Sequence, residues 1–378
     1  MMVPENEAAL AEAIAGADGP LAVRGGGTRG VDLPGEVLST AGLSGVDLYE
    51  PSALTLVVGA GTPVAEIDAL LAGENQRLAF EPMDHRGLLG TSGTPTIGGV
   101  IAGNISGSRR VQVGAARDFL LGVRFVDGRG QMLKNGGRVM KNVTGYDLVK
   151  LMAGSWGTLG VLSQVSLKVL PRAEAQATLV VGCADAAGAV GAMSAALGSP
   201  FDVSGAGFAP AEPGGENKAL IRVEGFADSV SYRAGRLKEL LAKHGDVDVV
   251  AADISGSIWA NLRDVVPFQG REGDVWRISA RPSQAAALVD RLGAEATLLD
   301  WGGGLIWALM AEGTDLRARA GAYDGHATLI RAGAETKARL GMFQPQPAAV
   351  EVLQAGLRDR FDPRGLFNPG LMQSPVEA

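Results

Sequence analysis

The distribution of glycine most constrains what this chain can fold into. The 378 residues include 55 glycines, about twice the usual share of ~7%, and these concentrate in clusters between positions 25 and 160. Glycine permits positive φ and close approach of the backbone to a neighbouring group. Glycine clusters in loops therefore suit a large ligand that carries phosphates. A glycine- and alanine-rich genome explains part of the excess but leaves the clustering unexplained.

The first cluster follows a short apolar strand in "LAVRGGGTRG", residues 21–30, and contains G-x-G-x-x-G at Gly25, Gly27 and Gly30. The dinucleotide fingerprint of a Rossmann domain requires the last glycine to open a helix whose N-terminus holds the pyrophosphate. Here "PG" stands at 34–35, where the first helical turns would lie, and proline lacks the amide hydrogen. This context argues against the Rossmann fingerprint and leaves a different phosphate-binding loop or a tight turn.

Three further glycine clusters share this placement at the junction of a strand with a turn or helix. The four are "RGGGT" at 24–28, "GAG" at 59–61, "TIGGVIAGNISG" at 96–107 and "GSWGTLGV" at 154–161. Backbone amides freed at such turns bind an extended diphosphate without charged side chains. A single cluster is usually an ordinary turn, but four in one domain favour a phosphate-binding surface.

Charge and cysteine content exclude several classes of protein. The net charge of −7 and a pI near 5.2 argue against nucleic acid as a partner. The only cysteine, Cys183, excludes an intrachain disulfide and a four-cysteine metal or iron–sulfur site, which fits a reducing cytosol. The N-terminus lacks the pattern of a signal peptide, and no apolar run approaches the ~20 residues of a membrane span. We expect a cytoplasmic protein.

The chain divides by composition near residue 172. Residues 1–172 hold the four glycine clusters and form the first expected domain. Residues 173–342 alternate strand and helix patterns without a sequence repeat, which indicates a second, α+β domain. Residues 343–378 contain a helix ending near Phe361 and then a Pro/Gly/Asn loop, and we expect this segment to pack back on the first domain.

Hydrophobic patterning predicts the individual elements. A β-hairpin is expected in "LLGVRFVDGRGQML", residues 120–133, with Asp127-Gly128 at the turn. In the first domain we also expect a helix at 5–15, strands at 21–23, 55–61 and 161–170, and helices at 62–73 and 146–153. In the second domain we expect strands at 177–183, 218–226, 274–282, 304–311 and 326–332, and helices at 185–197, 227–244 and 283–293.

The glycine motifs resemble a known family. "PLAVRGGGT", "TIGGVIAGNISGSRRVQVGAARDFLLGVRFVDGRG" and "AGSWGTLGV" are similar to the FAD-binding domain of the p-cresol methylhydroxylase (PCMH)/vanillyl-alcohol oxidase family. "KNVTGYDLVKLMAGSWGTLGV" at 141–161 and "FDPRGLFNPG" at 361–370 narrow the resemblance to the smaller FAD-binding subunits of bacterial glycolate oxidases. The resemblance implies an α+β fold: a two-part PCMH-type FAD-binding domain, a smaller α+β cap or substrate domain, and a C-terminal segment returning to the FAD domain.

The resemblance also implies how FAD is held. The amides of Gly25–Thr28 and the segment 96–107 would enclose the diphosphate and ribityl chain, while the backbone of Gly157–Val161 would reach the adenine half. The isoalloxazine would face the second domain. The cofactor contacts that the motifs imply are Arg24, Gly25, Gly26, Gly27, Thr28, Thr96, Ile97, Gly98, Gly99, Asn104, Gly107, Gly154, Ser155, Gly157, Thr158, Gly160, Val161 and Asn368.

Two positions depart from what relatives carry. Some relatives attach the flavin covalently to a histidine at the position of Thr28, so we expect non-covalent FAD here. Trp156 stands where the family's "GSEGTLG" has glutamate, which puts that local contact in doubt. The three histidines His85, His244 and His326 are far apart in sequence without metal-ligand spacing, so we expect no metal.

Oxidation of a 2-hydroxy acid by a flavin needs a base for the hydroxyl proton and a cation for the carboxylate. His326 is our candidate base, and Arg277 and Arg331, on apolar strands, are candidate carboxylate contacts. Lys141 and Tyr146 flank the "KNVTGYD" turn and are candidates to line the site. Each has an ordinary alternative: a packed histidine, an internal salt bridge, or a helix cap.

By resemblance, the substrate is glycolate or a similar 2-hydroxy acid, and the product of glycolate oxidation is glyoxylate. Because one cysteine cannot hold an iron–sulfur cluster, the electrons would pass to a larger FAD subunit and a separate iron–sulfur subunit, with the complex attached peripherally to the inner face of the cytoplasmic membrane. The alternatives are a non-catalytic flavin-bearing electron-transfer or scaffold subunit, a free-standing oxidase that uses oxygen, and a UDP-sugar enolpyruvate reductase with the same flavin fold.

Overall fold

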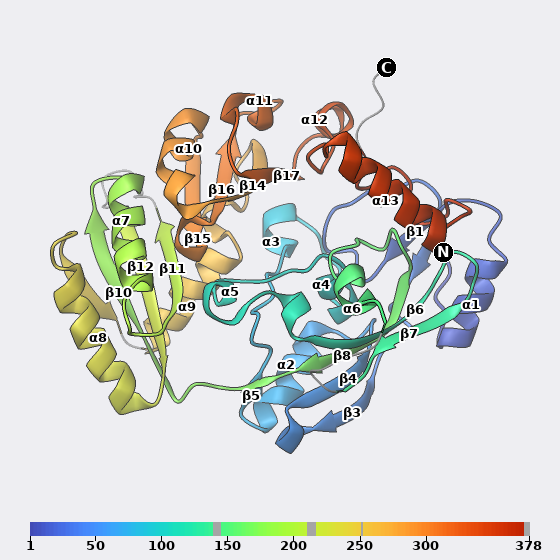
Figure 1. The fold of residues 1–378 in the computed structure, drawn as a ribbon, viewed down its shortest axis with the longest axis horizontal. Helices are drawn as coiled ribbons and strands as arrows, with labels where there is room; N and C mark the ends of the chain where they lie inside the picture. The colour runs from blue at the N-terminus through green and yellow to red at the C-terminus, as the bar shows by residue number, and fades with distance from the viewer. Residues whose placement is uncertain (139–144, 210–216, 251, 374–378) are drawn as a thin grey trace. The chain divides into compact units, whose positions relative to one another are not determined.

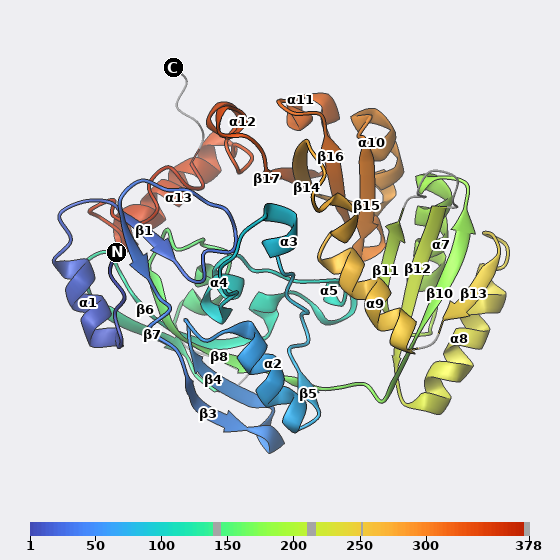
Figure 2. The same cartoon turned by 180° about the vertical axis from the view of Figure 1, so that it is seen from behind.

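The computed structural model describes residues 1–138, 145–209, 217–250 and 252–373, and the chain folds as two compact units. The first unit comprises Met1–Ser106, Ala115–Arg172 and the C-terminal segment from Pro345. The second comprises Gly107–Gly114 and Ala173–Gln344. Figures 1 and 2 show the ribbon from opposite sides. A short segment that follows a glycine cluster of the first unit therefore packs as part of the second.

A five-stranded antiparallel sheet of order β3-β4-β8-β6-β7 and a parallel pair β1-β2 form the framework of the first unit. Its strands are β1 (Leu21–Arg24), β2 (Glu36–Ser39), β3 (Val46–Glu50), β4 (Thr55–Gly59), β5 (Gln76–Arg77), β6 (Leu120–Val126), β7 (Met132–Gly136), β8 (Val161–Lys168) and β9 (Leu170–Pro171). Its helices are α1 (Glu7–Ala15), α2 (Val64–Gly73), α3 (Arg86–Leu89), α4 (Ile97–Ala102), α6 (Leu148–Met152) and α13 (Ala348–Phe361).

The hairpin β6–β7 confirms the turn that the sequence predicts. The Asp127 carboxylate accepts hydrogen bonds from the amides of Arg129 and Gln131, both at 2.9 Å, which fixes the loop between the strands. At Gly128 a Cβ would lie 2.7 Å from the Cα of Asp362, so only glycine allows this approach of the C-terminal segment. The hairpin turn is thus also a docking point for the chain end.

The C-terminal segment returns to the first unit, as the sequence predicts. The carboxylate of Asp362 accepts hydrogen bonds from the amides of Leu366 and Phe367 at 3.0 and 2.7 Å, which forms a compact turn. The amide of Leu21 in β1 donates to Leu366 O, and the amide of Asn368 donates to Leu21 O. Leu366 and Phe367 are buried with residues of α1 and β8, so this segment completes the core beneath the first glycine loop.

An eight-stranded antiparallel sheet of order β13-β10-β12-β11-β15-β16-β14-β17 forms the second unit. Its strands are β10 (Ala175–Cys183), β11 (Val203–Ala209), β12 (Asn217–Gly225), β13 (Val247–Val250), β14 (Asp274–Ala280), β15 (Ala296–Asp300), β16 (Leu305–Met310) and β17 (Gly325–Arg331). Its helices are α5 (Arg110–Val113), α7 (Ala186–Leu197), α8 (Ala227–Leu241), α9 (Ala252–Arg263), α10 (Ala285–Leu292), α11 (Leu316–Ala320) and α12 (Ala334–Leu340).

The topology of this sheet repeats although the sequence does not. Each half runs strand, helix, two strands, helix, strand, the split β-α-β-β-α-β arrangement. The halves meet edge to edge at β11 and β15, where Phe208 pairs with Leu299. The strands and helices that the sequence predicts here are confirmed, but the strands β11, β13 and β15 and the helices α5, α9, α11 and α12 were not foreseen.

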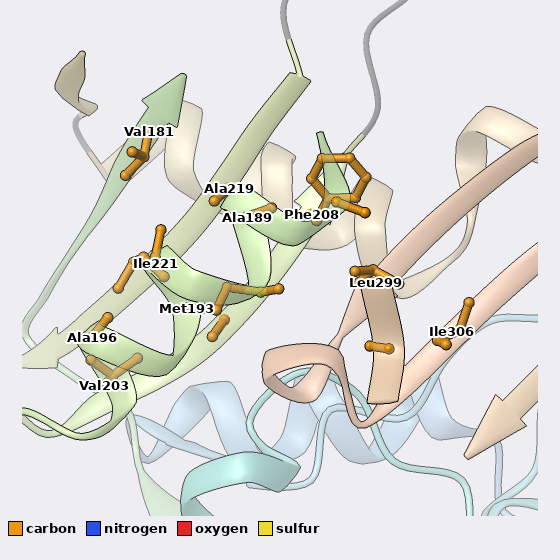
Figure 3. Packing of buried hydrophobic residues seen from close by; sticks show 14 of the residues in the cluster. Val181, Ala189, Met193, Ala196, Val203, Phe208, Ala219, Ile221, Leu299 and Ile306 are labelled. Atoms are coloured by element: carbon orange, nitrogen blue, oxygen red, sulfur yellow. The ribbon is translucent and has the colours of Figure 1, made fainter. Parts of the chain in front are cut away.

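Helices α7, α8, α10 and α11 contribute their apolar faces to one core that covers a face of the sheet. Figure 3 shows Met193 and Ala196 of α7 lying against sheet residues Ile221 and Val203. Helix α9 covers the other face. Successive residues of a strand face opposite sides, so Thr178 of β10 faces away from the core that contains Ala177 and Leu179. Trp259 of α9 donates to the hydroxyl of Thr178 at 2.8 Å.

Candidate functional site

A cavity of about 340 Å³ lies in the first unit, among its glycine clusters. This volume is within the range of small-molecule sites in proteins. The loop that follows β1, residues 25–30, forms one wall. Glycines of α4 and of the turn before β8 form others, together with Asn368 of the C-terminal segment. The clusters that the sequence sets far apart therefore meet at one site.

The backbone of the first glycine loop supplies free donors. Among the residues that the structure describes, none accepts a hydrogen bond from the amides of Gly25, Gly26, Gly27 or Thr28. Gly27 has φ +69°, a region that side-chain-bearing residues rarely adopt, and a Cβ there would meet nothing within 4 Å. Successive free amides in such a loop form a concavity that binds anions.

Close backbone contact fixes the position of this loop. A Cβ at Gly26 would lie 1.5 Å from Thr94 O, and a Cβ at Gly93 would lie 1.7 Å from Gly26 O. Both distances are far below any van der Waals contact. The two loops can therefore pack this tightly only because glycine stands at 26 and 93, and the second loop holds the first against the cavity.

Asn368 joins three parts of the site. Its side-chain oxygen accepts from the amide of Val23 in β1 at 2.7 Å, and its side-chain nitrogen donates to Trp156 O at 2.8 Å. Its own φ is +44°, a conformation that asparagine tolerates better than most residues. The C-terminal segment thereby positions both the first glycine loop and the turn that contains Gly157.

Of the eighteen cofactor contacts that the sequence predicts, twelve line this cavity: Arg24, Gly25, Gly26, Gly27, Thr28, Thr96, Gly98, Gly99, Ser155, Gly157, Gly160 and Asn368. Six do not line it. Ile97 and Val161 are fully buried, and the Thr158 hydroxyl donates to Ser155 O. Asn104 and Gly154 lie off the wall, and Gly107 belongs to the second unit. Residues that line the cavity but were not named among the expected contacts include Arg29, Gly103 and Trp156.

His85 also lines the cavity and is buried, 6% exposed. The structure places it on the wall. His244, in contrast, lies in the second unit beside Gly191 of α7, and its Nε2 is buried without a hydrogen-bond partner in the described part of the chain.

A cationic cluster forms in the second unit around Trp301. The guanidinium carbons of Arg110 and Arg277 lie 4.5 and 5.1 Å from the centre of the indole ring. The carboxylate of Asp300 is engaged by the Ser108 hydroxyl at 2.6 Å and by the amide of Trp301 at 2.7 Å. Two guanidinium groups against one occupied carboxylate leave a net positive charge, which favours an anionic ligand.

Electrostatics couple Arg277 to its neighbours. Desolvation by burial and, after it, the charge of Arg110 lower the pKa of Arg277 to about 10, while Asp300 acts in the opposite direction. In the described residues Arg277 has no hydrogen-bond or ion-pair partner. A guanidinium in this condition is a suitable partner for a ligand carboxylate.

His326 belongs to the same cluster. It pairs with Ser279 across β17 and β14, two residues along from Arg277. Desolvation, followed by the positive charges of Arg277 and Arg110, lowers the pKa of His326 below its usual value. The imidazole is therefore neutral near pH 7, the form that accepts a proton. The structure thus groups two of the four catalytic candidates, Arg277 and His326.

Of the remaining candidates, the structure describes Arg331 and Tyr146. Arg331 donates to the carbonyls of Phe268, Arg271 and Gly273, which favours a role in holding these turns together. Lys141 lies outside the described residues. Tyr146 is 89% exposed and does not line the cavity.

The segment 107–114 is fastened to the second unit by side chains. Arg109 donates to both carboxylate oxygens of Glu224 at 2.5 and 2.7 Å, and both side chains are buried. Trp301 Nε1 donates to Gly107 O at 3.0 Å, and Gln112 donates to Asp202 at 2.7 Å. These bonds bring Arg110 beside Trp301, although nothing in the local sequence around Arg110 signals this partner.

Comparison with known proteins identifies the class. Residues 1–136 match the family described as "FAD binding domain". Two solved structures of alkyldihydroxyacetonephosphate synthase resemble the fold with TM-scores of 0.69 and 0.68 at 14% and 15% sequence identity. These cover 98% and 97% of this chain and 77% and 76% of theirs. The fold and the glycine cavity are those of a PCMH-type FAD-binding flavoprotein.

Sequence relatives define the family more narrowly. The chain is 36% identical to the glycolate oxidase subunit GlcE of Escherichia coli (strain K12) over 364 residues, 94% of this chain and 93% of that protein. It therefore belongs to the family of the FAD-binding glycolate oxidase subunit GlcE. The glycolate oxidase subunit GlcD of Bacillus subtilis (strain 168) is 34% identical over 166 residues, which are 43% of this chain and 34% of GlcD.

The cavity residues fit FAD. Free amides in the first glycine loop match a diphosphate, the glycines leave room for the ligand to approach the backbone, and Arg29 adds a positive charge to the wall. In the part of the chain that the structure describes, no helix has the length and hydropathy that a membrane crossing requires.

Proposed function

We propose that this chain is the FAD-binding subunit of a glycolate oxidase complex, in which it oxidises glycolate or a similar 2-hydroxy acid to the 2-oxo acid. The observation that carries the proposal is the match to GlcE over 93% of that protein, a relative named as a glycolate oxidase subunit. In this proposal the glycine cavity holds FAD and the cationic cluster binds the substrate; the lining of the cavity and the two guanidinium groups beside Trp301 support these roles.

FAD, when bound, accepts the hydrogen of the alcohol carbon together with its electron pair. The roles of the chain's own residues follow from the cluster around Trp301. Arg277 and Arg110 hold the substrate carboxylate, because guanidinium groups bind carboxylates in paired hydrogen bonds. An imidazole nitrogen of His326 takes the proton of the hydroxyl group as the carbonyl forms. The alcohol thus loses one hydride and one proton and becomes the 2-oxo acid.

The flavin is held without a covalent link. Thr28 is buried on the cavity wall, and its carbonyl accepts a hydrogen bond from the hydroxyl of Thr91 at 2.9 Å. Threonine cannot form the histidyl bond that some relatives use. Acid precipitation of the yellow protein should therefore leave the colour in the supernatant, and a coloured pellet would contradict this.

The electrons pass to partners. We propose a larger FAD subunit, related to the GlcD that this chain resembles, and an iron–sulfur subunit, because Cys183 alone cannot hold a cluster. The complex would attach peripherally at the inner face of the cytoplasmic membrane. Affinity purification from the native host should recover these partners. Recovery of the chain alone, with full turnover on oxygen, would contradict them.

Anaerobic reduction tests the catalytic role. The purified, FAD-loaded chain is mixed with glycolate, and the loss of flavin absorbance is followed. Bleaching by the isolated chain supports substrate oxidation at this subunit. If bleaching occurs only after a larger FAD subunit is added, the chain is instead a non-catalytic, flavin-bearing electron-transfer or scaffold subunit.

A further inference from the structure

Arg29 occupies a prepared place on the wall of the flavin cavity. Its guanidinium carbon lies 5.5 Å from the centre of the Trp156 ring. A Cβ at Gly103 would lie 2.1 Å from Nη1 of Arg29, so a side chain at 103 would clash with the guanidinium in this position. Two segments distant from Arg29 in sequence thus shape the space around this one side chain.

The charge of Arg29 has no partner in the described residues other than the ring of Trp156. Desolvation by burial lowers the pKa of Arg29 to about 10. Arg24, on the same wall, differs because its guanidinium lies 3.4 Å from the carboxylate of Asp32. A desolvated charge without a counter-charge is costly, and an anionic ligand in the cavity removes that cost.

We propose that the guanidinium of Arg29 binds the diphosphate of FAD, with Trp156 as the aromatic surface that holds the guanidinium in place. The diphosphate is the anionic part of FAD, and guanidinium groups bind phosphate oxygens in a fixed, bidentate geometry. This inference rests on FAD binding and is independent of the glycolate reaction.

The identity of residue 156 matters for this assignment. The backbone of Trp156 is fixed at both ends, because its amide donates to Ala102 O and its carbonyl accepts from Asn368. Its ring is therefore presented to Arg29 from a rigid turn. A glutamate at 156, as in the related motif, would place a carboxylate beside Arg29 and compete with the diphosphate. Tryptophan leaves the positive charge available to the ligand.

Binding of ADP and adenosine to the same protein isolates the diphosphate contact. Protein stripped of flavin, and shown to take up FAD again, is titrated with each ligand by calorimetry. Arg29→Met should weaken ADP binding about 10- to 100-fold, as expected for a charge-assisted hydrogen bond, while adenosine binding is unchanged. Arg29→Lys should restore part of the loss. Arg117→Met removes an exposed positive charge of the same unit and should change neither.

Two further variants test the surroundings of Arg29. Gly103→Ala keeps the charge but displaces the guanidinium, so it should reproduce part of the loss for ADP only. Trp156→Glu should weaken ADP binding in the wild-type background and have much less effect in Arg29→Met, because the two residues are coupled.

Equal losses for ADP and adenosine in Arg29→Met would reduce Arg29 to a structural role, and unchanged ADP binding would overturn the contact. A wild-type chain that binds neither FAD nor ADP would instead overturn FAD binding itself. Failure of glycolate to reduce the flavin would leave the assignment of Arg29 intact.

Discussion

The flavin cavity and the cationic cluster are built in opposite ways. In the first unit, glycines from several segments line the binding surface, and the essential property of residues such as Gly26 is that they have no side chain. In the second unit, the site consists of side chains, with Arg277 and Arg110 placed against Trp301. The two sites should therefore respond to different kinds of substitution. Added volume should damage the first, and removed charge should damage the second.

The largest effect is expected from added volume in the first glycine loop. Gly26→Val should abolish FAD binding, because a Cβ at 26 would lie 1.5 Å from Thr94 O and force the two loops apart. The expected clash is thus with the protein's own backbone and not with a phosphate of the ligand. Bound flavin is measured by absorbance after gel filtration, and circular dichroism checks that the variant is folded.

Two variants sharpen this result. Gly93→Ala perturbs the same approach from the opposite loop, since its Cβ would lie 1.7 Å from Gly26 O, and should lose flavin as well. Gly90→Asn is the matched control. Gly90 has φ +65° with no atom within 4 Å of a Cβ, and asparagine tolerates that conformation. A folded Gly26→Val variant with full flavin content would show that the loop is not fixed in this way.

The next largest effect is expected from the candidate base. His326→Ala should leave flavin content intact and slow reduction by glycolate at least ~100-fold, the lower range of general acid–base catalysis. Stopped-flow absorbance of the FAD-loaded protein measures the rate. An unchanged rate would show that His326 is not the base, and a loss of flavin would show that its role is structural.

Removal of one charge from the cluster should have a smaller effect. Arg277→Met should raise the glycolate concentration needed for half-maximal reduction about 10- to 100-fold, because a charged contact to the carboxylate is lost. Arg236→Met is the control, since Arg236 is exposed on α8 and pairs there with Glu239. Equal behaviour of the two variants would show that Arg277 is not a substrate contact.

The two sites also differ in how well the sequence predicts them. The glycine loops are contiguous stretches, and each is recognisable without knowledge of its neighbours. The structure accordingly places most of the predicted contacts, from Arg24 to Asn368, on one cavity. The misses were side chains within the same wall. Arg29 lines the cavity but stands just outside the "RGGGT" cluster, and Trp156 was noted only as a departure from the family motif, not as a contact.

The cluster in the second unit offered less to sequence reasoning. His326 and Arg277 were candidates because of their residue types, and their proximity comes from the pairing of β17 with β14. Arg110 could not be foreseen, because its segment follows a glycine motif of the first unit yet packs in the second. Long-range pairing decides such contacts, and local patterns do not encode it.

The same limit applies to the fold of the second unit. The strand β11, "VSGAGFA", lacks the β-branched alternation that predicts a strand, and two glycines interrupt it. At Gly205 a Cβ would lie 3.0 Å from the ring of Trp259. The glycine there allows α9 to approach the sheet, a reason that only the tertiary structure reveals. Without β11, β13 and β15 the repeated topology of the two halves could not be recognised.

The smallest expected effect is a shift of one titration. Desolvation and the charges of Arg277 and Arg110 lower the pKa of His326 from an ordinary value of ~6.5. Because the base acts in its neutral form, the rate of flavin reduction at saturating glycolate should stay constant on acidification until the pH is below ~6.5. Arg277→Met removes one of the positive charges, so the pKa of His326 should rise and the acid limb should move to higher pH.

Proton NMR titration of the histidine rings measures this shift without reference to activity. His326→Ala assigns the resonance. If the His326 resonance titrates identically with and without Arg277, the two side chains do not interact electrostatically. The two residues would then act independently. The catalytic proposal, which depends on their electrostatic coupling, would lose its support.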